Sequence, residues 1–378
     1  MSVRVGGRTT DNGQRTMDDG TGLKPGTGPT SVLRPPSLKA SVLIVGYNES
    51  AMILDCIGSV LDQDFPREEY EVIFVDNGSH DNSAELVQRH YPEVTIVRLM
   101  PNVGYPAGNN AGLRYVNAPR VVMLSADTVV PRTWLRELLR PMDEDPQVKV
   151  CHAAMVIPGD PGYEEGLATR ATPKAAAYHD MTRLGFIKPT WVATDSEPVQ
   201  TLHVAGASAA LDLSILEEIG GYLLDGDYYL DCDEIDLGFR VNALGYKVLA
   251  VPRAAYYHRH PFNTQVNLKN IRTRARRLLR LQRNKFITFY KNLYLSEFLL
   301  YLPLVLFGGP FKVMAYASRF SGLQRIANML GLAAFAWAGF LVAALGYFPR
   351  FAAKRRFILA HRRQPKGWFV RELWKRDL

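Results

Sequence analysis

Residues 41–46 read SVLIVG, an apolar run that ends in a glycine. Consecutive β-branched and aliphatic residues favour a strand that is buried on both faces. Strands of this kind occur in parallel sheets whose two faces are covered by helices. The run therefore predicts a central strand of an α/β domain.

Similar apolar runs follow along the chain, and stretches with helical periodicity separate them. Strands that alternate with helices predict a Rossmann-like, mostly parallel, doubly wound sheet. The intervening helices are expected at 53–61, 82–90 and 106–117. The further strands are expected at 72–75, 94–97, 121–124 and, after a less regular region, 247–251.

Polar residues follow each of the first four predicted strands. Ligands of doubly wound sheets bind beyond the carboxyl ends of the strands, so these residues share the expected binding edge. Turn geometry alone also favours Asn, Asp and Gly there, and the pattern fits both interpretations. The residues at the four ends are Tyr47-Asn48-Glu49, Asp76-Asn77-Gly78-Ser79, Asn102-Val103-Gly104 and Ser125-Ala126-Asp127.

Residues 102–112, NVGYPAGNNAG, join the third predicted strand to the next helix. Their glycines allow the backbone to approach a ligand closely, and Pro106 suits a first helical turn. A helix N-terminus also favours anions. The spacing predicts contact with a nucleotide, with a tight loop packed on the sheet as the alternative.

Two groups of residues suggest chemistry with carboxylates. Residues 231–236, DCDEID, hold four carboxylates, whose mutual repulsion is unfavourable unless a cation or a proton-transfer role compensates. A solvated acidic helix start is the alternative. Asp127, with His258 as its distant partner, suits a hard divalent cation that keeps positions open for phosphate oxygens.

Seven segments, in order between about Ser41 and His258, resemble the family 2 glycosyltransferases of GT-A fold. The rhamnosyltransferase-like enzymes of cell-surface polysaccharide synthesis are the most similar subgroup. The segments are VLIVGYNES, IFVDNGSHDNS, PNVGYPAGNNAG, LSADTVVP, HVAGASAALDLSILEEIGGY, DYYLDCDEIDLGFR and VPRAAYYH.

The resemblance implies a role for each matching residue. The nucleotide is expected at Tyr47, Glu49 and Asp76, and the donor-site motif at Asn102, Gly104 and Asn110. Asp127 matches the metal-binding motif for Mg²⁺ or Mn²⁺, and His258 matches a metal or phosphate contact. The acidic motif supplies the catalytic candidates Glu234, Asp233 and Asp236.

Two positions depart from the family pattern. The metal motif reads Ser125-Ala126-Asp127, with one carboxylate where some relatives have two. The acidic pair is inverted, so that Glu234 stands where relatives have their basic aspartate. Glutamate can do the same chemistry with one more methylene of reach. We expect Glu234 to be the base, with Asp233 as the competing candidate.

The resemblance implies inverting, metal-dependent transfer of a sugar from a nucleotide-diphosphate sugar. The acceptor is expected to be a polyprenyl-linked glycan at a membrane, in cell-surface polysaccharide or glycoconjugate synthesis. The alternatives are a polyprenyl-phosphate sugar synthase and a non-catalytic GT-A scaffold that binds nucleotide sugar. No nucleic-acid partner is expected, because aromatic and basic residues are not interleaved across the α/β region.

The C-terminal third combines basic and apolar segments. Residues 266–292 predict a basic amphipathic juxtamembrane helix. Residues 293–350 predict a membrane hairpin or re-entrant segment, because 326–349 are uncharged and long enough to cross ~30 Å of hydrocarbon. Residues 351–378 are expected to form a basic cytosolic tail.

Charge distribution, cysteine content and the N-terminal segment indicate where in the cell the protein is expected. The formal charge of +8 is concentrated around the apolar C-terminal segment, which suits an anionic membrane surface. Three widely spaced cysteines show no disulfide framework, which fits a reducing compartment. Residues 1–38 predict disorder, and no apolar segment precedes Val42. The catalytic domain, residues 39–265, is therefore expected in the cytosol at the inner (plasma) membrane.

Overall fold

The computed structural model describes residues 38–259, 271–305, 331, 334, 337–338, 341, 346 and 348–376. The segment predicted to be disordered, residues 1–38, lies outside the described residues except for Leu38, and so does most of the predicted membrane segment. The catalytic domain predicted at residues 39–265 is described up to Arg259.

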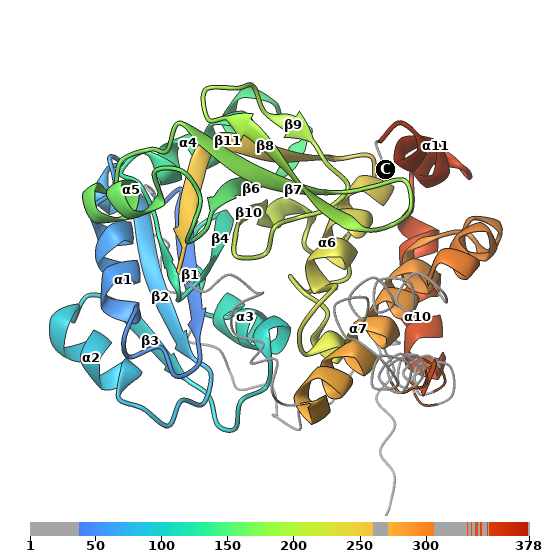
Figure 1. The fold of residues 1–378 in the computed structure, drawn as a ribbon, viewed down its shortest axis with the longest axis horizontal. Coiled ribbons are helices and arrows are strands. Elements are labelled where there is room, and N and C mark those ends of the chain that lie inside the picture. The colour runs from blue at the N-terminus through green and yellow to red at the C-terminus, as the bar shows by residue number, and fades with distance from the viewer. Residues whose placement is uncertain are drawn as a thin grey trace, which may run out of the picture. The chain divides into compact units, whose positions relative to one another are not determined.

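An eleven-stranded sheet forms the centre of the domain. Its first half is parallel, with β1 (Ala40–Gly46) between β2 (Tyr70–Asp76) and β4 (Arg120–Ser125). β3 (Thr95–Arg98) pairs with β2 at the edge, which gives the order β3-β2-β1-β4 (Figure 1). This half confirms the doubly wound arrangement and brings the carboxyl ends of β1, β2 and β4 to one edge.

The second half of the sheet is mixed, and the expectation of a mostly parallel sheet is wrong there. β10 (Ser208–Asp212) lies antiparallel between β4 and β6 (Val148–Val156), because no crossover helix reverses the chain before it. β11 (Lys247–His258) runs parallel to β6 and antiparallel to β5 (Thr128–Val129). Antiparallel pairings complete the sheet through β7 (Ala175–Met181), β8 (Ile187–Ala193) and β9 (Val199–Gln200).

Side chains alternate between two cores, as the twofold period of a strand requires. Val42 and Ile44 face the first core, and Leu43 and Val45 face the second. The first core is covered by α1 (Ile53–Leu61), α2 (Ser83–His90) and α4 (Trp134–Glu144), and the second by α3 (Tyr105–Leu113), η2 (Leu213–Ile215) and α6 (Asp233–Ala243). The shorter elements are η1 (Arg67–Glu69), α5 (Tyr163–Thr169) and η3 (Gly226–Tyr228).

A third core lies on the other side of α6 and involves the C-terminal helices. α7 (Ile271–Asn292) lies between α6 and α10 (Phe348–His361), as Figure 1 shows, and α11 (Trp368–Trp374) follows. Residues 295–305 are also helical. The segment predicted as a basic tail is therefore folded onto the domain, because it supplies apolar side chains to this core. Phe351, Phe369 and Leu373 are buried there with Phe239 of α6.

The helix predicted at 266–292 is present as α7, but its second half is packed into the protein. Phe286, Ile287 and Phe289 are buried in the third core. Among the residues that the structure describes, none of the helices is both apolar and long enough to cross a bilayer. Contact of the C-terminal segments with a membrane stays a prediction.

Buried ion pairs attach α7 to the α6 region. Lys291 lies 2.6 Å from a carboxylate oxygen of Asp225 and 2.8 Å from one of Asp236, and all three side chains are fully buried. Arg240 pairs with Asp236 at 2.9 Å. The cations of α7 and α6 thus compensate two of the acidic residues in the 225–236 region.

We expect Lys291→Met to lower the free energy of unfolding by about 3–5 kcal/mol, because it leaves Asp225 and Asp236 short of a buried partner. Urea unfolding followed by circular dichroism measures the change. The control is Lys247→Met, which breaks a 2.7 Å pair with Asp145 at a partly exposed position. That loss should stay within about 1 kcal/mol. Equal effects of the two substitutions would contradict this assignment.

Candidate active site

Two loops meet at the carboxyl ends of β1 and β2. The Ser79 hydroxyl accepts a hydrogen bond from the Asn48 backbone N–H at 2.9 Å, and the Asn48 side-chain oxygen accepts one from the His80 backbone N–H at 2.8 Å. Tyr47 is exposed, and its ring meets the His80 ring edge to face at 6.4 Å. These rings form an aromatic surface suited to a nucleotide base. His80 was not among the predicted site residues.

Asp76 and Asn77, at the end of β2, have separate tasks. One Asp76 carboxylate oxygen accepts a hydrogen bond from the Ser79 backbone N–H at 2.9 Å. The Asn77 amide donates to the Gly104 carbonyl and accepts from the Val103 N–H, both at 3.1 Å. Asn77 therefore anchors the 102–104 loop beside Asp76, a role that sequence analysis missed because Asp-Asn-Gly is also an ordinary turn.

The 102–104 loop packs against a second loop from far along the chain. The Asn102 side-chain oxygen accepts a hydrogen bond from the Gly104 N–H at 2.9 Å. Gly104 has a φ of +88°, and a Cβ there would lie 2.5 Å from the Tyr229 carbonyl oxygen. Only glycine fits at this position, where the Tyr105 N–H also donates to the Tyr229 carbonyl at 3.0 Å.

Asn110 differs from the other predicted donor-binding residues. Its amide donates to the Leu224 carbonyl at 2.6 Å, and its side-chain oxygen accepts from the Leu223 N–H at 3.0 Å. These bonds commit the amide to the backbone of the loop before η3. We therefore assign Asn110 a positioning role in place of direct donor contact.

Asp127 and His258 meet because β5 pairs with the end of β11. A carboxylate oxygen of Asp127 lies 3.3 Å from Nε2 of His258. The Asp127 carbonyl also accepts a hydrogen bond from the Arg259 N–H at 2.9 Å. The structure thus brings together the two residues predicted to share a cation.

A second carboxylate, that of Glu49, lies near this pair. Burial first, and then the negative charges of Asp127 and Asp81, raise the pKa of Glu49 to about 7. One Glu49 carboxylate oxygen is buried and has no hydrogen-bond partner in the described part of the chain. A cation between Glu49 and Asp127 would relieve this repulsion.

The protein supplies few side chains that could bind a metal ion. This suits a hard cation whose coordination shell is completed by oxygen atoms of the substrate. Within the residues that the structure describes, no cluster of three or more His, Cys, Asp or Glu side chains is arranged to hold an ion. Mg²⁺ and related ions are commonly held by one or two carboxylates together with substrate phosphates. Asp127 and His258 fit that pattern.

The turn before α6 has strained backbone. Tyr229, Asp231 and Cys232 have φ values of +64°, +73° and +67°. Such conformations cost about 1–3 kcal/mol each for residues other than glycine and persist only where surrounding contacts impose them. They occur immediately before the Asp233-Glu234 pair.

Within the described residues, Asp233 and Glu234 have no cation partners of the kind that Asp225 and Asp236 have. Asp233 is buried, and neither of its carboxylate oxygens has a hydrogen-bond partner among the described residues. Burial and then the charge of Glu234 raise the pKa of Asp233 well above its usual range. Burial, with the charge of Asp231 adding to it, raises the pKa of Glu234 to about 7. A carboxylate with such a pKa is suited to accept a proton near neutral pH.

Glu234 and the Asp127–His258 pair are linked electrostatically through Tyr256 of β11. Burial, followed by the charges of Asp127, Tyr105 and Glu234, raises the pKa of Tyr256, so these groups lie within electrostatic range of its hydroxyl. The Tyr105 hydroxyl donates to the Gly206 carbonyl at 2.7 Å. Gly206 leaves the space that Glu234 occupies, since a side chain there would collide with it.

Asp236 is the predicted catalytic residue that the structure reassigns. Its carboxylate is fully buried and is bound by Lys291, Arg240 and the Asn292 amide, the last at 2.7 Å. Both of its carboxylate oxygens are therefore occupied by partners within the protein. Asp236 therefore has a structural role, and the base candidates are Glu234 and Asp233.

Residues 41–219 match the protein family described as Glycosyl transferase family 2. Polypeptide N-acetylgalactosaminyltransferase 11 of Xenopus tropicalis is 26% identical over 243 residues, which is 59% of this chain and 39% of the relative. Poly(ribitol-phosphate) beta-glucosyltransferase of Bacillus spizizenii is 28% identical over 97 residues, 25% of this chain and 15% of the relative. The chain thus spans well under half the length of these relatives.

Among solved structures, GalNAc-T7 with UDP, GalNAc and Mn²⁺ is similar, with a TM-score of 0.61 and 17% identity. The likeness covers 90% of this chain and 57% of that one. At this identity the comparison shows a shared GT-A-like fold.

We expect Asp233→Asn to raise the melting temperature at pH 8 by roughly 2–4 °C and to change little near pH 4. A carboxyl whose pKa is raised in the folded state contributes full stability below its ordinary pKa and loses it as pH rises. Asparagine carries no such penalty. Differential scanning fluorimetry across this pH range measures the difference.

Asp212→Asn is the control of opposite sign. Burial tends to raise the pKa of Asp212, but hydrogen bonds from Lys149 and Ser214 outweigh burial and hold this pKa below its usual range. This substitution should therefore destabilise the protein at pH 8 and have little effect near pH 3. A stability gain at pH 8 from both substitutions, or from neither, would sink the interpretation.

Proposed function

Because residues 41–219 form a glycosyl transferase family 2 domain, we propose that the chain is an inverting, metal-dependent glycosyltransferase that uses a nucleotide-diphosphate sugar. The observation that carries this proposal is that two groups act on Tyr256: Asp127, which pairs with His258, and Glu234, which has no cation partner among the described residues. One group can accept a proton there, and the other can hold a cation.

The donor nucleotide is assigned to the carboxyl ends of β1 and β2. The exposed Tyr47 ring beside His80 offers a stacking surface for the base. Asp76 retains a carboxylate oxygen for a base or ribose hydroxyl, since its described bond to Ser79 uses the other oxygen. Asn102 and Gly104 shape the adjoining loop, which leads from the nucleotide towards Tyr229.

Asp127 and His258 would hold the divalent cation, Mg²⁺ or Mn²⁺, with donor phosphate oxygens as further ligands. When bound, the cation neutralises charge that builds up on the diphosphate. The Mn²⁺ in the solved structure of GalNAc-T7 with UDP supports this assignment. The proximity of Glu49 to Asp127 adds negative potential to the same site.

The reaction is a single displacement at the anomeric carbon. The oxygen of an acceptor hydroxyl forms the new bond to the anomeric carbon. At the same time the bond between the anomeric carbon and the diphosphate oxygen breaks, so the configuration at that carbon is inverted. Glu234 takes the proton of the acceptor hydroxyl, and the nucleoside diphosphate leaves. Asp233, which is more deeply buried and whose own pKa is raised, is the alternative base.

We assign the acceptor to the class of membrane-linked glycans, such as a polyprenyl-linked glycan of cell-surface polysaccharide synthesis. The support is the family resemblance to rhamnosyltransferase-like enzymes, the similarity to a poly(ribitol-phosphate) beta-glucosyltransferase, and the basic and apolar sequence of residues 266–350. The catalytic domain would then work on the cytosolic side of the inner membrane.

We expect Glu234→Gln to reduce turnover by about 10²–10⁴-fold, because glutamine cannot accept the acceptor proton. Donor affinity should stay unchanged, because the nucleotide is assigned to the carboxyl ends of β1 and β2 and not to α6. Release of nucleoside diphosphate in the presence of a lipid-linked acceptor measures turnover, and calorimetry with donor measures affinity.

The matched control for this substitution is Glu217→Gln, at an exposed carboxylate, which should leave both quantities unchanged. Turnover that survives in Glu234→Gln but disappears in Asp233→Asn would transfer the role of base to Asp233. Wild-type protein that binds nucleotide sugar without turnover on any acceptor would favour the scaffold alternative.

We expect Asp127→Asn to abolish the extra thermal stabilisation that Mn²⁺ gives in the presence of a nucleoside diphosphate. A ligand that binds the folded state raises stability by about 2.7 kcal/mol at 100 times its Kd. Thermal shifts with UDP, dTDP and GDP, each with and without Mn²⁺, provide the measurement. Asp143→Asn, at a surface ion pair with Arg120, is the control. Persistence of the Mn²⁺ effect in Asp127→Asn would refute this metal assignment.

A further inference from the structure

One face of α7 carries a buried polar stripe. Asn284, Thr288 and Lys291 follow one another at helical spacing, and each side chain is fully buried. Buried polar groups are unfavourable unless they are hydrogen-bonded, so this face must serve specific partners. Those partners lie in the strained segment before α6 and in the residues that flank it.

Asn284 contacts the strained turn through its side-chain amide. Nδ2 donates to the carbonyl oxygens of Asp231 at 2.7 Å, Leu230 at 2.8 Å and Tyr228 at 3.2 Å. These three carbonyls belong to one short segment, and the positive-φ residues Tyr229, Asp231 and Cys232 fall within it or directly after it. The two N–H groups of a single amide thus lie within hydrogen-bond distance of three carbonyl oxygens of the distorted turn, and one N–H is shared between two of them.

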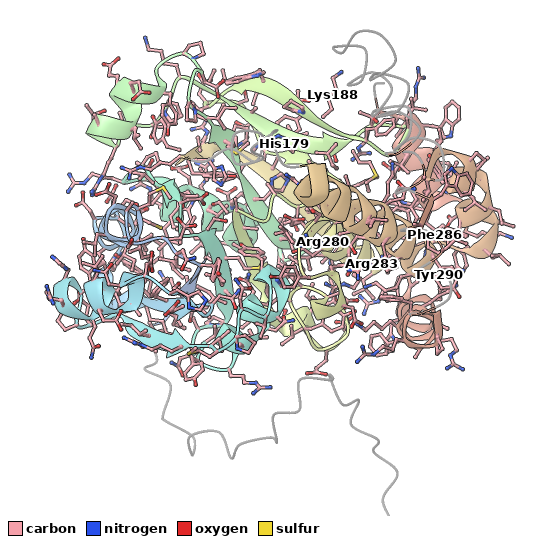
Figure 2. The ribbon with its side chains drawn as sticks, turned by 60° about the horizontal axis from the view of Figure 1, so that its bottom comes forward. His179, Lys188, Arg280, Arg283, Phe286 and Tyr290 are labelled. Carbon is pink, nitrogen blue, oxygen red and sulfur yellow. The ribbon has the colours of Figure 1, made fainter. Side chains whose placement is uncertain are left out.

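The orientation of the Asn284 amide is fixed by its neighbour. The Arg283 guanidinium donates to the Asn284 side-chain oxygen from Nε at 3.0 Å and from a terminal nitrogen at 2.8 Å. The same guanidinium donates to the Asp227 carbonyl at 3.0 Å. In Figure 2, Arg280 and Arg283 lie along α7 ahead of Phe286 and Tyr290. Because Arg283 occupies the oxygen, the nitrogen must face the turn.

Thr288 and Lys291 extend this attachment on both sides of the turn. The Thr288 hydroxyl forms a hydrogen bond with the Tyr228 hydroxyl at 3.0 Å. Lys291 pairs with Asp225 before the turn and with Asp236 after it. The segment that leads into Glu234 is therefore fixed at its start, its middle and its end by one helix.

We propose that Asn284 is a positioning residue, whose amide holds the backbone of residues 228–231 so that Glu234 is presented to the acceptor hydroxyl. This inference rests on the proposed function, since it assigns Glu234 the role of base. The strain in the turn supplies the reason: positive φ at three non-glycine residues persists only under external contacts, and Asn284 makes the most central of them.

The electrostatic surroundings of Glu234 make its position measurable. Asp231 and Asp233 precede it in the chain, and its charge reaches Tyr105 of α3 and Tyr256 of β11. Arg277 and Arg280 of α7 act in turn on Asp231. Burial is the largest cause of the raised pKa of Glu234, so release of the turn into solvent should lower that pKa. The acidic limb of the pH–rate profile reports this shift.

The test compares Asn284→Ala and the isosteric Asn284→Asp with wild-type protein. We expect kcat to fall about 100-fold with little change in the KM for donor, because the base is displaced while the nucleotide site is intact. The acidic limb of log kcat/KM should move from near pH 7 in the wild type to lower pH in Asn284→Ala. A purely structural role would reduce the amount of active protein and leave the limb in place.

Asn242→Ala is the matched control. Asn242 is also a buried asparagine, and its amide donates to the carbonyls of Gly238 at 2.8 Å and Thr201 at 3.2 Å, away from the strained turn. This substitution should lower the melting temperature to a similar extent and leave the pH profile unchanged. If Asn284→Ala is too unstable to assay, Thr288→Val is the milder variant, and Thr288→Ser should restore wild-type behaviour.

Hydrogen exchange separates failure of this inference from failure of the proposed function. Amides of residues 228–234 should exchange faster in Asn284→Ala than in Asn242→Ala, whether or not the wild type transfers sugar. Faster exchange in Asn284→Ala, without any turnover by the wild type, would refute the proposed function. The conclusion that Asn284 fixes the backbone of residues 228–231 would still stand. Unchanged exchange together with an unmoved pH limb in active Asn284→Ala would overturn the inference.

Discussion

The buried contact between Lys291 and the two aspartates Asp225 and Asp236 is the constraint around which the site is arranged. A buried carboxylate is unfavourable without a partner, so these two acids require the cation that α7 brings. Asp233 and Glu234 lie between them in sequence and receive no such partner among the described residues. Asp233 and Glu234, whose pKa values are raised mainly by burial, thus remain available as candidate bases.

The parallel half of the sheet could be predicted from sequence because its signal is local. Each strand around Val42, Val72 and Val122 is a short apolar run, and the helices between them show their own period. The meeting of Asp127 with His258 was also expected, both from the ligands that a hard cation prefers and from family resemblance. The antiparallel insertion of β10 was not foreseen, since strand direction depends on how the chain returns and not on the residues within the strand.

Two residues in recognised motifs show where sequence stops being informative. Asn110 and Asp236 occupy motif positions, yet Leu224 and Lys291 decide their roles. Both partners are separated from them by long stretches of chain. Conversely, Asn77 and His80 lie in an ordinary turn motif and gain importance only from the loops that reach them. The chemistry of a side chain depends on its type, but its availability depends on its neighbours.

The same argument changes the meaning of the basic helix. Alternating arginines and apolar residues in α7 predicted a helix lying on a membrane, but the face with Asn284, Thr288 and Lys291 is turned into the protein. A helix cannot offer that face to lipid and also hold the strained turn.

Any membrane contact in the described part of the chain must therefore use other surfaces. Leu295, Leu299 and Leu300, which are 59%, 53% and 58% exposed on the next helix, provide one close to α7. Membrane attachment would then use the helix at residues 295–305, while α7 positions Glu234, so that the two roles belong to adjoining helices.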